Sequence, residues 1–161
     1  MAREVVRFKD VAGKDILWPN FEGRAGDYNN PGERNFCLRL TEEEYHQLLD
    51  AGYTSPKEKV RMTEDGEEYV NRYIPIKVNF NSQRPPQIHQ VTRRGLVKLD
   101  EESCALIDRN NIKKASIAFT PYFRKVSNTQ TAYLQEMLVE FEEESFADEY
   151  LNDHFKSDDE A

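Results

Sequence analysis

Apolar and polar residues alternate along several short segments of the chain, which is the pattern of β-strands with one buried face. In residues 35–40 every second side chain is apolar, and in residues 73–80 Ile74, Ile76 and Val78 alternate with more polar neighbours. Pro75 lacks a backbone N–H, so this strand is expected to be an edge or to carry a bulge at that point. Further strands are predicted at residues 5–8, on either side of Arg94-Gly95 within 87–99, and at 114–126 and 131–142, the last two joined as a hairpin.

Two short helices are predicted between these strands. The segment 41–52 begins with Thr41 and has Glu44 three residues later, which is the spacing of a capping box, and it ends at Gly52. Tyr45, Leu48 and Leu49 are expected on its buried face. The segment 100–111 begins with acidic residues that suit the positive end of a helix dipole, which predicts a second helix of about two turns.

The remaining segments read as connections. Residues 14–34 are dense in Gly, Pro and Asn, which predicts one long loop, and residues 54–68 are polar around Asp65-Gly66, which predicts an exposed hairpin or loop. The count is therefore about six strands and two short helices, without alternation of strands and helices. This arrangement predicts a mainly β fold, either a small antiparallel barrel or a strongly curved sheet.

The length of 161 residues fits one domain, and the charge is concentrated at one end of it. Residues 140–161 contain ten acidic residues and one lysine, a net charge of -9, whereas residues 1–139 carry +1. We therefore expect a domain over residues 1–141 and an acidic, flexible tail over 142–161. The tail also holds aromatic residues, which are consistent either with a short amphipathic helix packed on the body or with a segment that occupies a basic groove or contacts partner proteins.

The chain offers little for catalysis. Its three histidines lack the spacing of metal ligands on one helix face, and no phosphate-binding loop or nucleophile elbow is present. Cys37 and Cys104 match neither a metal motif nor a disulfide framework, so they are expected to be free thiols that pack in a reducing compartment. No signal peptide or apolar span is evident, so a cytoplasmic protein without catalytic residues, metal or cofactor is expected.

Aromatic and basic residues, in contrast, are interleaved in four places: the loop 14–34, the strand near residue 77, the Arg93-Arg94 turn and the hairpin near residue 124. Single-stranded nucleic acid is held by rings that stack on bases and by cations that neutralise phosphates. Strand phase leaves Tyr73, Lys77 and Tyr122 pointing away from the core. Each ring can equally well pin a loop or cover a neighbouring segment, so only the repeated pairing favours binding.

In the order of several short sequence segments, the chain resembles the phage-encoded single-stranded DNA-binding proteins of replication modules. These segments are GERNFCLRL after the Gly-rich loop, RYIPIKVNF followed by Pro-Pro, LDEES, and the closing hairpin with PYF and TAYLQEMLVEFEE. The resemblance implies an OB-type barrel that coats single-stranded DNA with little sequence preference. By position, the candidate nucleic-acid-binding residues are Trp18, Phe21, Arg24, Tyr28, Arg34, Arg39, Tyr73, Lys77, Arg84, Arg93, Arg94, Tyr122, Arg124 and Lys125.

The resemblance also implies partners and leaves alternatives open. An acidic tail of this kind contacts replication or recombination proteins, and a phage-encoded protein would work in the host cytoplasm; whether the protein forms a homodimer is left open. The alternative function is a protein-interaction module or a DNA mimic that acts through its acidic tail. A small metal-dependent nuclease is a second alternative.

Overall fold

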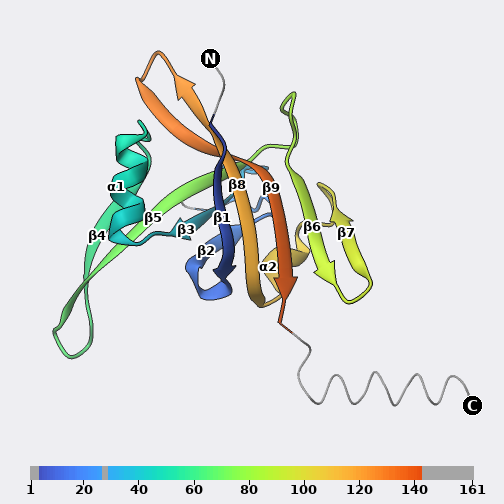
Figure 1. Cartoon of the computed structure of the whole chain (residues 1–161), viewed down its shortest axis with the longest axis horizontal. Helices are drawn as coiled ribbons and strands as arrows, with labels where there is room; N and C mark the ends of the chain where they lie inside the picture. Colours follow the sequence, from blue (N-terminus) through green and yellow to red (C-terminus); the bar gives the residue numbers. More distant parts are fainter. Residues whose placement is uncertain (1–3, 27–28, 143–161) are drawn as a thin grey trace, which may run out of the picture.

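The computed structural model describes residues 4–26 and 29–142, and these residues form a single sheet with two short helices (Figure 1). In chain order the elements are β1 (Val6–Ala12), η1 (Gly13–Asp15), β2 (Ile16–Asn20), β3 (Arg34–Arg39), α1 (Glu42–Asp50), β4 (Lys57–Met62), β5 (Glu68–Val78), β6 (Gln87–Thr92), β7 (Gly95–Leu99), α2 (Leu106–Arg109), β8 (Ile112–Arg124) and β9 (Thr129–Phe141). The predicted mainly β fold is confirmed. None of the described helices has the length and apolar character that a membrane span requires.

Strand β9 lies at the centre of the sheet. One edge of β9 pairs with β8 in antiparallel register, from Arg124↔Thr129 to Ile112↔Phe141. Its other edge pairs in parallel with β5 near residues 132–133 and with β6 over residues 136–139. The main path of the sheet runs β1-β8-β9-β5-β3-β2, and among the described strands β4 pairs only with β5.

This pairing corrects two features of the expected barrel. The expected strands were antiparallel, but β9 makes two parallel pairings, so the sheet is mixed. The path also ends at β1 and at β2, and within residues 4–26 and 29–142 no pairing joins these ends. The sheet is thus strongly bent but is not a closed barrel.

The hydrophobic core lies inside the bend of the sheet. Strands β3 and β5 cross the β1, β8 and β9 strands at a steep angle, so their inner faces meet (Figure 1). Most of the largest fully buried side chains come from both groups of strands: Phe36, Leu38, Ile74, Ile76, Ile117, Phe119, Leu134, Met137 and Val139. Because strand side chains alternate, burying this set commits the intervening residues to the outer face.

Helix α1 confirms its predicted cap. The Thr41 hydroxyl accepts a bond from the Glu44 N–H, the Glu44 carboxylate accepts one from the Thr41 N–H, and Gly52 ends the segment with a positive φ of 98°. Leu48 is buried, but Leu49 is exposed, so the expected buried face was too wide. Helix α2 is a single turn rather than two, because residues 101–105 form turns.

The segment 14–34 is not one loop, since β2 lies within it and pairs with β3. At Pro75 strand β5 is paired on one side only, with β3. On its other side the pairing with β4 ends at Tyr73 and the pairing with β9 begins at Ile76, so among the described residues Pro75 lies at a local edge, which is one of the two predicted forms. Residues 57–73 form a regular β4–β5 hairpin, in agreement with one of the two predicted forms.

Phe21 is a core residue held through both its ring and its backbone. Its side chain has no exposed surface, and its ring stacks on Phe36 with centroids 5.4 Å apart. The two carboxylate oxygens of Asp108 accept the N–H groups of Phe21 and Glu22, each at 2.8 Å. The Phe21 carbonyl accepts bonds from Arg34 Nε at 2.9 Å and from Cys104 Sγ at 3.3 Å. This cluster anchors the end of β2 to α2 and β3.

We expect Phe21→Ala to lower the free energy of unfolding by about 3–5 kcal/mol, because it empties a fully packed site. Trp18→Ala, which removes an exposed ring, should cost only about 1 kcal/mol from its contact with Tyr73. Urea denaturation followed by circular dichroism compares the two variants. Equal losses for both variants would contradict the core assignment of Phe21.

Candidate nucleic-acid interface

The outer face of the sheet gathers side chains from β5, β8 and β9. Lys77 lies beside Tyr133 in the parallel β5–β9 pairing. Tyr122 lies opposite Thr131, and Arg124 opposite Thr129, in the antiparallel β8–β9 pairing. Residues paired in this way share a face, so these side chains stand together on the side away from the core.

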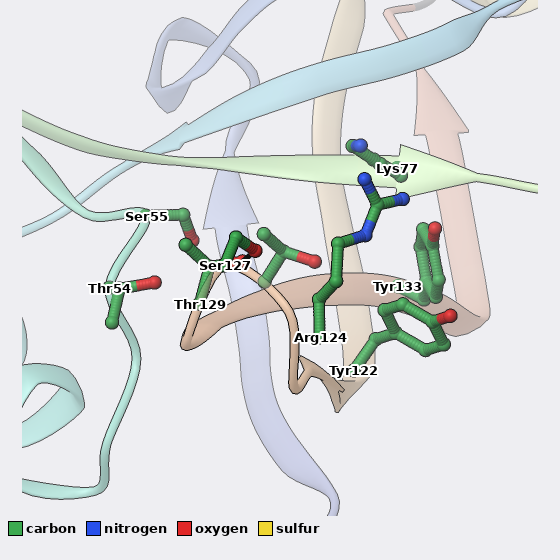
Figure 2. Close-up of a pocket in the computed structure, with 9 residues that line it drawn as sticks. Thr54, Ser55, Lys77, Tyr122, Arg124, Ser127, Thr129 and Tyr133 are labelled. Carbon is green, nitrogen blue, oxygen red and sulfur yellow. Dashed lines mark hydrogen bonds between the residues drawn. The ribbon is translucent and has the colours of Figure 1, made fainter.

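A pocket of about 280 Å³ is formed by these side chains. Its lining residues are Thr54, Ser55, Lys77, Tyr122, Arg124, Ser127, Thr129, Thr131 and Tyr133 (Figure 2). It therefore combines two cations, two phenol rings and five hydroxyl groups. Three of the residues predicted from the sequence, Lys77, Tyr122 and Arg124, come together here.

The two cations of the pocket, Lys77 and Arg124, lie on one surface. Figure 2 shows the Arg124 guanidinium beside the Lys77 side chain. Among the described residues neither cation forms an ion pair with a carboxylate. Two like charges on one surface repel each other, and a bound anion lowers that energy. The electrostatics of the pocket therefore favour a phosphate or another anion.

Two tyrosine rings line the same pocket beside the cations. The ring centroids of Tyr122 and Tyr133 are 5.1 Å apart and the planes are inclined by 44°. Tyr122 is 37% exposed, whereas Tyr133 is half-buried beside it. Tyr133 thus supports Tyr122, and the pair presents an aromatic surface next to the cations.

The wall of the pocket is fixed by bonds between distant parts of the chain. Thr54 N–H donates to the Gln130 carbonyl at 3.0 Å, and Gln130 N–H donates to the Thr54 hydroxyl at 2.8 Å. These bonds join the segment after α1 to the start of β9. Beside them, the Ser55 hydroxyl is buried and has no hydrogen-bond partner within the described part of the chain.

A second aromatic pair lies farther along the outer face. Trp18 contacts Tyr73 edge to face, with ring centroids 5.1 Å apart, and 58% of Trp18 is exposed. The backbone of Trp18 has φ of 49° at the irregular step in the β2–β3 pairing between Leu17 and Asn20. A left-handed conformation is strained for a bulky residue and costs about 1–3 kcal/mol. The fold therefore tolerates strain at the point where this ring is exposed.

Other predicted residues have different roles from those expected. Phe21 lies in the core and offers no stacking surface, which corrects the expectation that it contacts a partner. Arg34 faces the core, where it bonds to the Phe21 carbonyl, pairs with Glu101 at 3.3 Å and lies 5.6 Å from the Phe80 ring centroid. Only 17% of its side chain is exposed, so the expected phosphate contact of Arg34 is also corrected.

The remaining predicted residues are distributed around the sheet. Arg39 is on the outer face, opposite Tyr73, and pairs with Asp15 at 3.4 Å. Tyr73 is buried beneath Trp18 and is not free to stack on a base. Lys125 is exposed and follows Arg124 in the hairpin turn. The other members lie apart from the pocket or outside the described residues.

The last five predicted residues lie away from the pocket or outside the described part of the chain. Arg24 is exposed near Glu22, and Arg84 is exposed in the loop after β5. Arg93 and Arg94 occupy the β6–β7 turn, beyond the end of β9 that is remote from the pocket (Figure 1). Tyr28, and the tail beyond residue 142, lie outside the described residues.

Sequence reasoning missed Tyr133 and the hydroxyl residues of the pocket. The signal for Tyr133 was available, because Ala132 and Leu134 are core residues and Tyr133 is out of phase with them. Thr54 and Ser55 gave no such signal, since they join the pocket through the pairing of Thr54 with Gln130. Contacts between residues 76 positions apart cannot be read from local periodicity.

The two cysteines have the character of packing residues. Burial raises the pKa of the Cys37 thiol to about 11, although the nearby Lys57 ammonium lowers it in part. Burial likewise raises the pKa of the Cys104 thiol to about 11. Nucleophilic cysteines require a lowered pKa, so both thiols have the opposite of the required environment.

A comparison with protein families identifies the kind of protein. The family model described as "Putative phage ssDNA-binding domain" matches residues 3–159, almost the whole chain. The chain belongs to this family. The resemblance drawn from the sequence is thereby confirmed, and with it the expectation of a single-stranded DNA-binding protein of phage type rather than an enzyme.

Solved structures of the same kind are also similar to this family member. The single-stranded DNA-binding protein from bacteriophage Enc34 aligns with a TM-score of 0.48 and 13% identity over 88% of this chain and 83% of that chain. Its C-terminal truncation gives a TM-score of 0.47 and 12% identity, covering 88% of each chain. The structure of that protein in complex with single-stranded DNA gives a TM-score of 0.47 and 10% identity, covering 88% of this chain and 89% of that chain. No curated protein sequence matches the chain.

Proposed function

We propose that this member of the family coats single-stranded DNA without sequence preference, and that the strand crosses the outer face of the sheet through the pocket. The observation that carries the proposal is the meeting in one pocket of two tyrosine rings and two cations that form no ion pair among the described residues. Lys77 and Arg124 would each neutralise a phosphate of the strand, and Tyr122 would stack on a base. Stacking contributes about 1–3 kcal/mol per base, and it is sequence-tolerant because every base has a π-face.

The hydroxyl groups of the pocket support the same assignment. Ser55 has a buried hydroxyl without a partner among the described residues, and Thr129 and Thr131 line the surface next to Arg124. Hydroxyl groups hydrogen-bond to phosphate and sugar oxygens, which positions a strand without reading its sequence. The pocket thus offers contacts to the backbone and to the flat surface of a base, and these contacts are common to all nucleotides.

Several broader assignments stay predictions. They include the OB-type relation of the sheet, a role in phage replication or recombination, the division at residues 141 and 142, and a contact of the acidic tail with partner proteins. The rival function, a DNA mimic acting through its tail, predicts no use of the pocket. Variants of the pocket therefore discriminate between the two functions.

The first test removes the cations of the pocket. Lys77→Gln with Arg124→Gln should weaken binding of labelled oligo-dT and lower the slope of log affinity against log salt by about 1.4, since each phosphate contact contributes about 0.7. Fluorescence anisotropy over a salt series measures both quantities. The matched control is Lys113→Gln with Lys114→Gln, which removes the same charge from residues that pair with Glu140. Equal effects of the two pairs would contradict a specific role for the pocket.

The second test separates stacking from hydrogen bonding. Tyr122→Ala should weaken binding of oligo-dT by about 5-fold to 150-fold, which corresponds to 1–3 kcal/mol, whereas Tyr122→Phe should keep most of the affinity because it retains the ring. Anisotropy at one low salt concentration gives the affinities, and urea denaturation shows that the variants remain folded. If the Phe variant binds as weakly as the Ala variant, stacking by Tyr122 is not the source of affinity.

A further inference from the structure

The β4–β5 hairpin forms an arm that extends from the body of the protein (Figure 1, lower left). We call residues 57–73 the arm. Within it, β4 pairs with β5 from Lys57↔Tyr73 to Met62↔Glu68, and every residue of β4 is exposed. Strand β4 has no other partner among the described strands. The arm therefore contributes little to the core.

Strand alternation gives the arm two different faces. Lys57, Lys59 and Arg61 share one face, and their partners Tyr73, Asn71 and Tyr69 lie on it as well. We call this the basic face of the arm. The opposite face carries Glu58, Val60 and Met62 with their partners Arg72, Val70 and Glu68.

The basic face has cations without acidic partners. The Arg72–Glu58 ion pair, at 2.8 Å, satisfies the charges on the opposite face. Among the described residues, Lys57, Lys59 and Arg61 form no ion pair. The acidic residues Glu64, Asp65 and Glu67 are confined to residues 63–67, the turn at the tip. Positive charge therefore extends along the arm and ends before its tip.

The basic face is continuous with the outer face of the sheet. Tyr73 lies opposite both Lys57 in β4 and Arg39 in β3, and Lys77 follows four residues later on the same side of β5. The Lys57 ammonium is also close enough to the Cys37 thiol, which lies on that face, to lower its pKa. A path therefore runs from the pocket past the Trp18–Tyr73 pair to the arm.

The spacing along this path suits a single strand of DNA. Alternate residues of a strand are about 6.6 Å apart, so the three cations cover about 13 Å. The spacing of about 6.6 Å between neighbouring cations is comparable with the separation of successive phosphates on an extended single strand. Tyr69, opposite Arg61, is 51% exposed and adds an aromatic ring to the row. Rings interleaved with cations are the components of single-strand binding.

We infer that single-stranded DNA leaves the pocket past Trp18 and continues along the basic face of the arm, so that the arm lengthens the binding site. This inference rests on the proposed function, because it begins at the same pocket. It assigns contacts to Lys57, Lys59, Arg61 and Tyr69, none of which belongs to the pocket.

The test compares a short and a long oligo-dT, of about four and about sixteen nucleotides, with the full chain. The arm variant is Lys57→Gln, Lys59→Gln and Arg61→Gln together. It should bind the short oligonucleotide within about two-fold of the unmodified protein, because the pocket is intact. It should bind the long one at least 10-fold more weakly, with a salt slope reduced by about 2. Tyr69→Ala should weaken only the long oligonucleotide.

The matched control is Lys9→Gln, Lys98→Gln and Lys113→Gln, which removes three exposed cations from β1, β7 and β8. An arm variant that binds the long oligonucleotide as this control does would overturn the inference. An equal loss for both lengths would overturn it as well, since the arm would then act at the pocket. If the unmodified protein binds neither oligonucleotide, the proposed function itself fails, and the two failures are thereby distinguished.

Discussion

The alternation of side chains in a bent sheet is the constraint on which the candidate site depends. Ile74 and Ile76 in β5 and Leu134 in β9 fill the inside of the bend, so Lys77 and Tyr133 must face outward next to each other. The β8–β9 pairing then places Tyr122 and Arg124 on the same surface. The core and the pocket therefore lie on the two faces of the same strands. The hydrophobic effect stabilises the core, and by fixing the core it also positions the side chains of the pocket.

Hydrogen bonds to the backbone near the end of β2 help to fix the shape of this surface. Asp108 and Arg34 hold the backbone of Phe21, so β2 ends at a fixed point beneath the outer face. Three residues before Phe21, the strained backbone of Trp18 presents its ring beside Tyr73. The charge of the inward-facing Arg34 is neutralised by Glu101. Lys77 and Arg124, in contrast, form no ion pair with any described residue. Unpaired cations on a rigid aromatic surface match the requirements of an extended polyanion.

The sequence predicts those parts of the structure that local patterns determine. The strands around Phe36 and Ile76, the cap of α1, and the outward direction of Lys77, Tyr122 and Arg124 follow from periodicity alone. Arg34 was expected to bind nucleic acid as part of a loop, but it belongs to β3 and lies on the inner face with Phe36. Phe123 has the same strand phase as the buried Ile117 and Phe119 but is exposed, because its end of the β8–β9 hairpin extends beyond the core. For the arm the sequence left a hairpin and a loop open, since both of its faces are polar enough to resemble a loop.

The most direct test of the account uses Trp18, the single tryptophan of the chain, which lies between the pocket and the arm. Its fluorescence is measured during titration of the unmodified protein with oligo-dT, in parallel with the anisotropy of a labelled oligo-dT. The account predicts saturable quenching of Trp18 that follows the anisotropy curve and is reversed by added salt. Saturable binding by anisotropy with unchanged Trp18 emission would contradict a DNA path across this face.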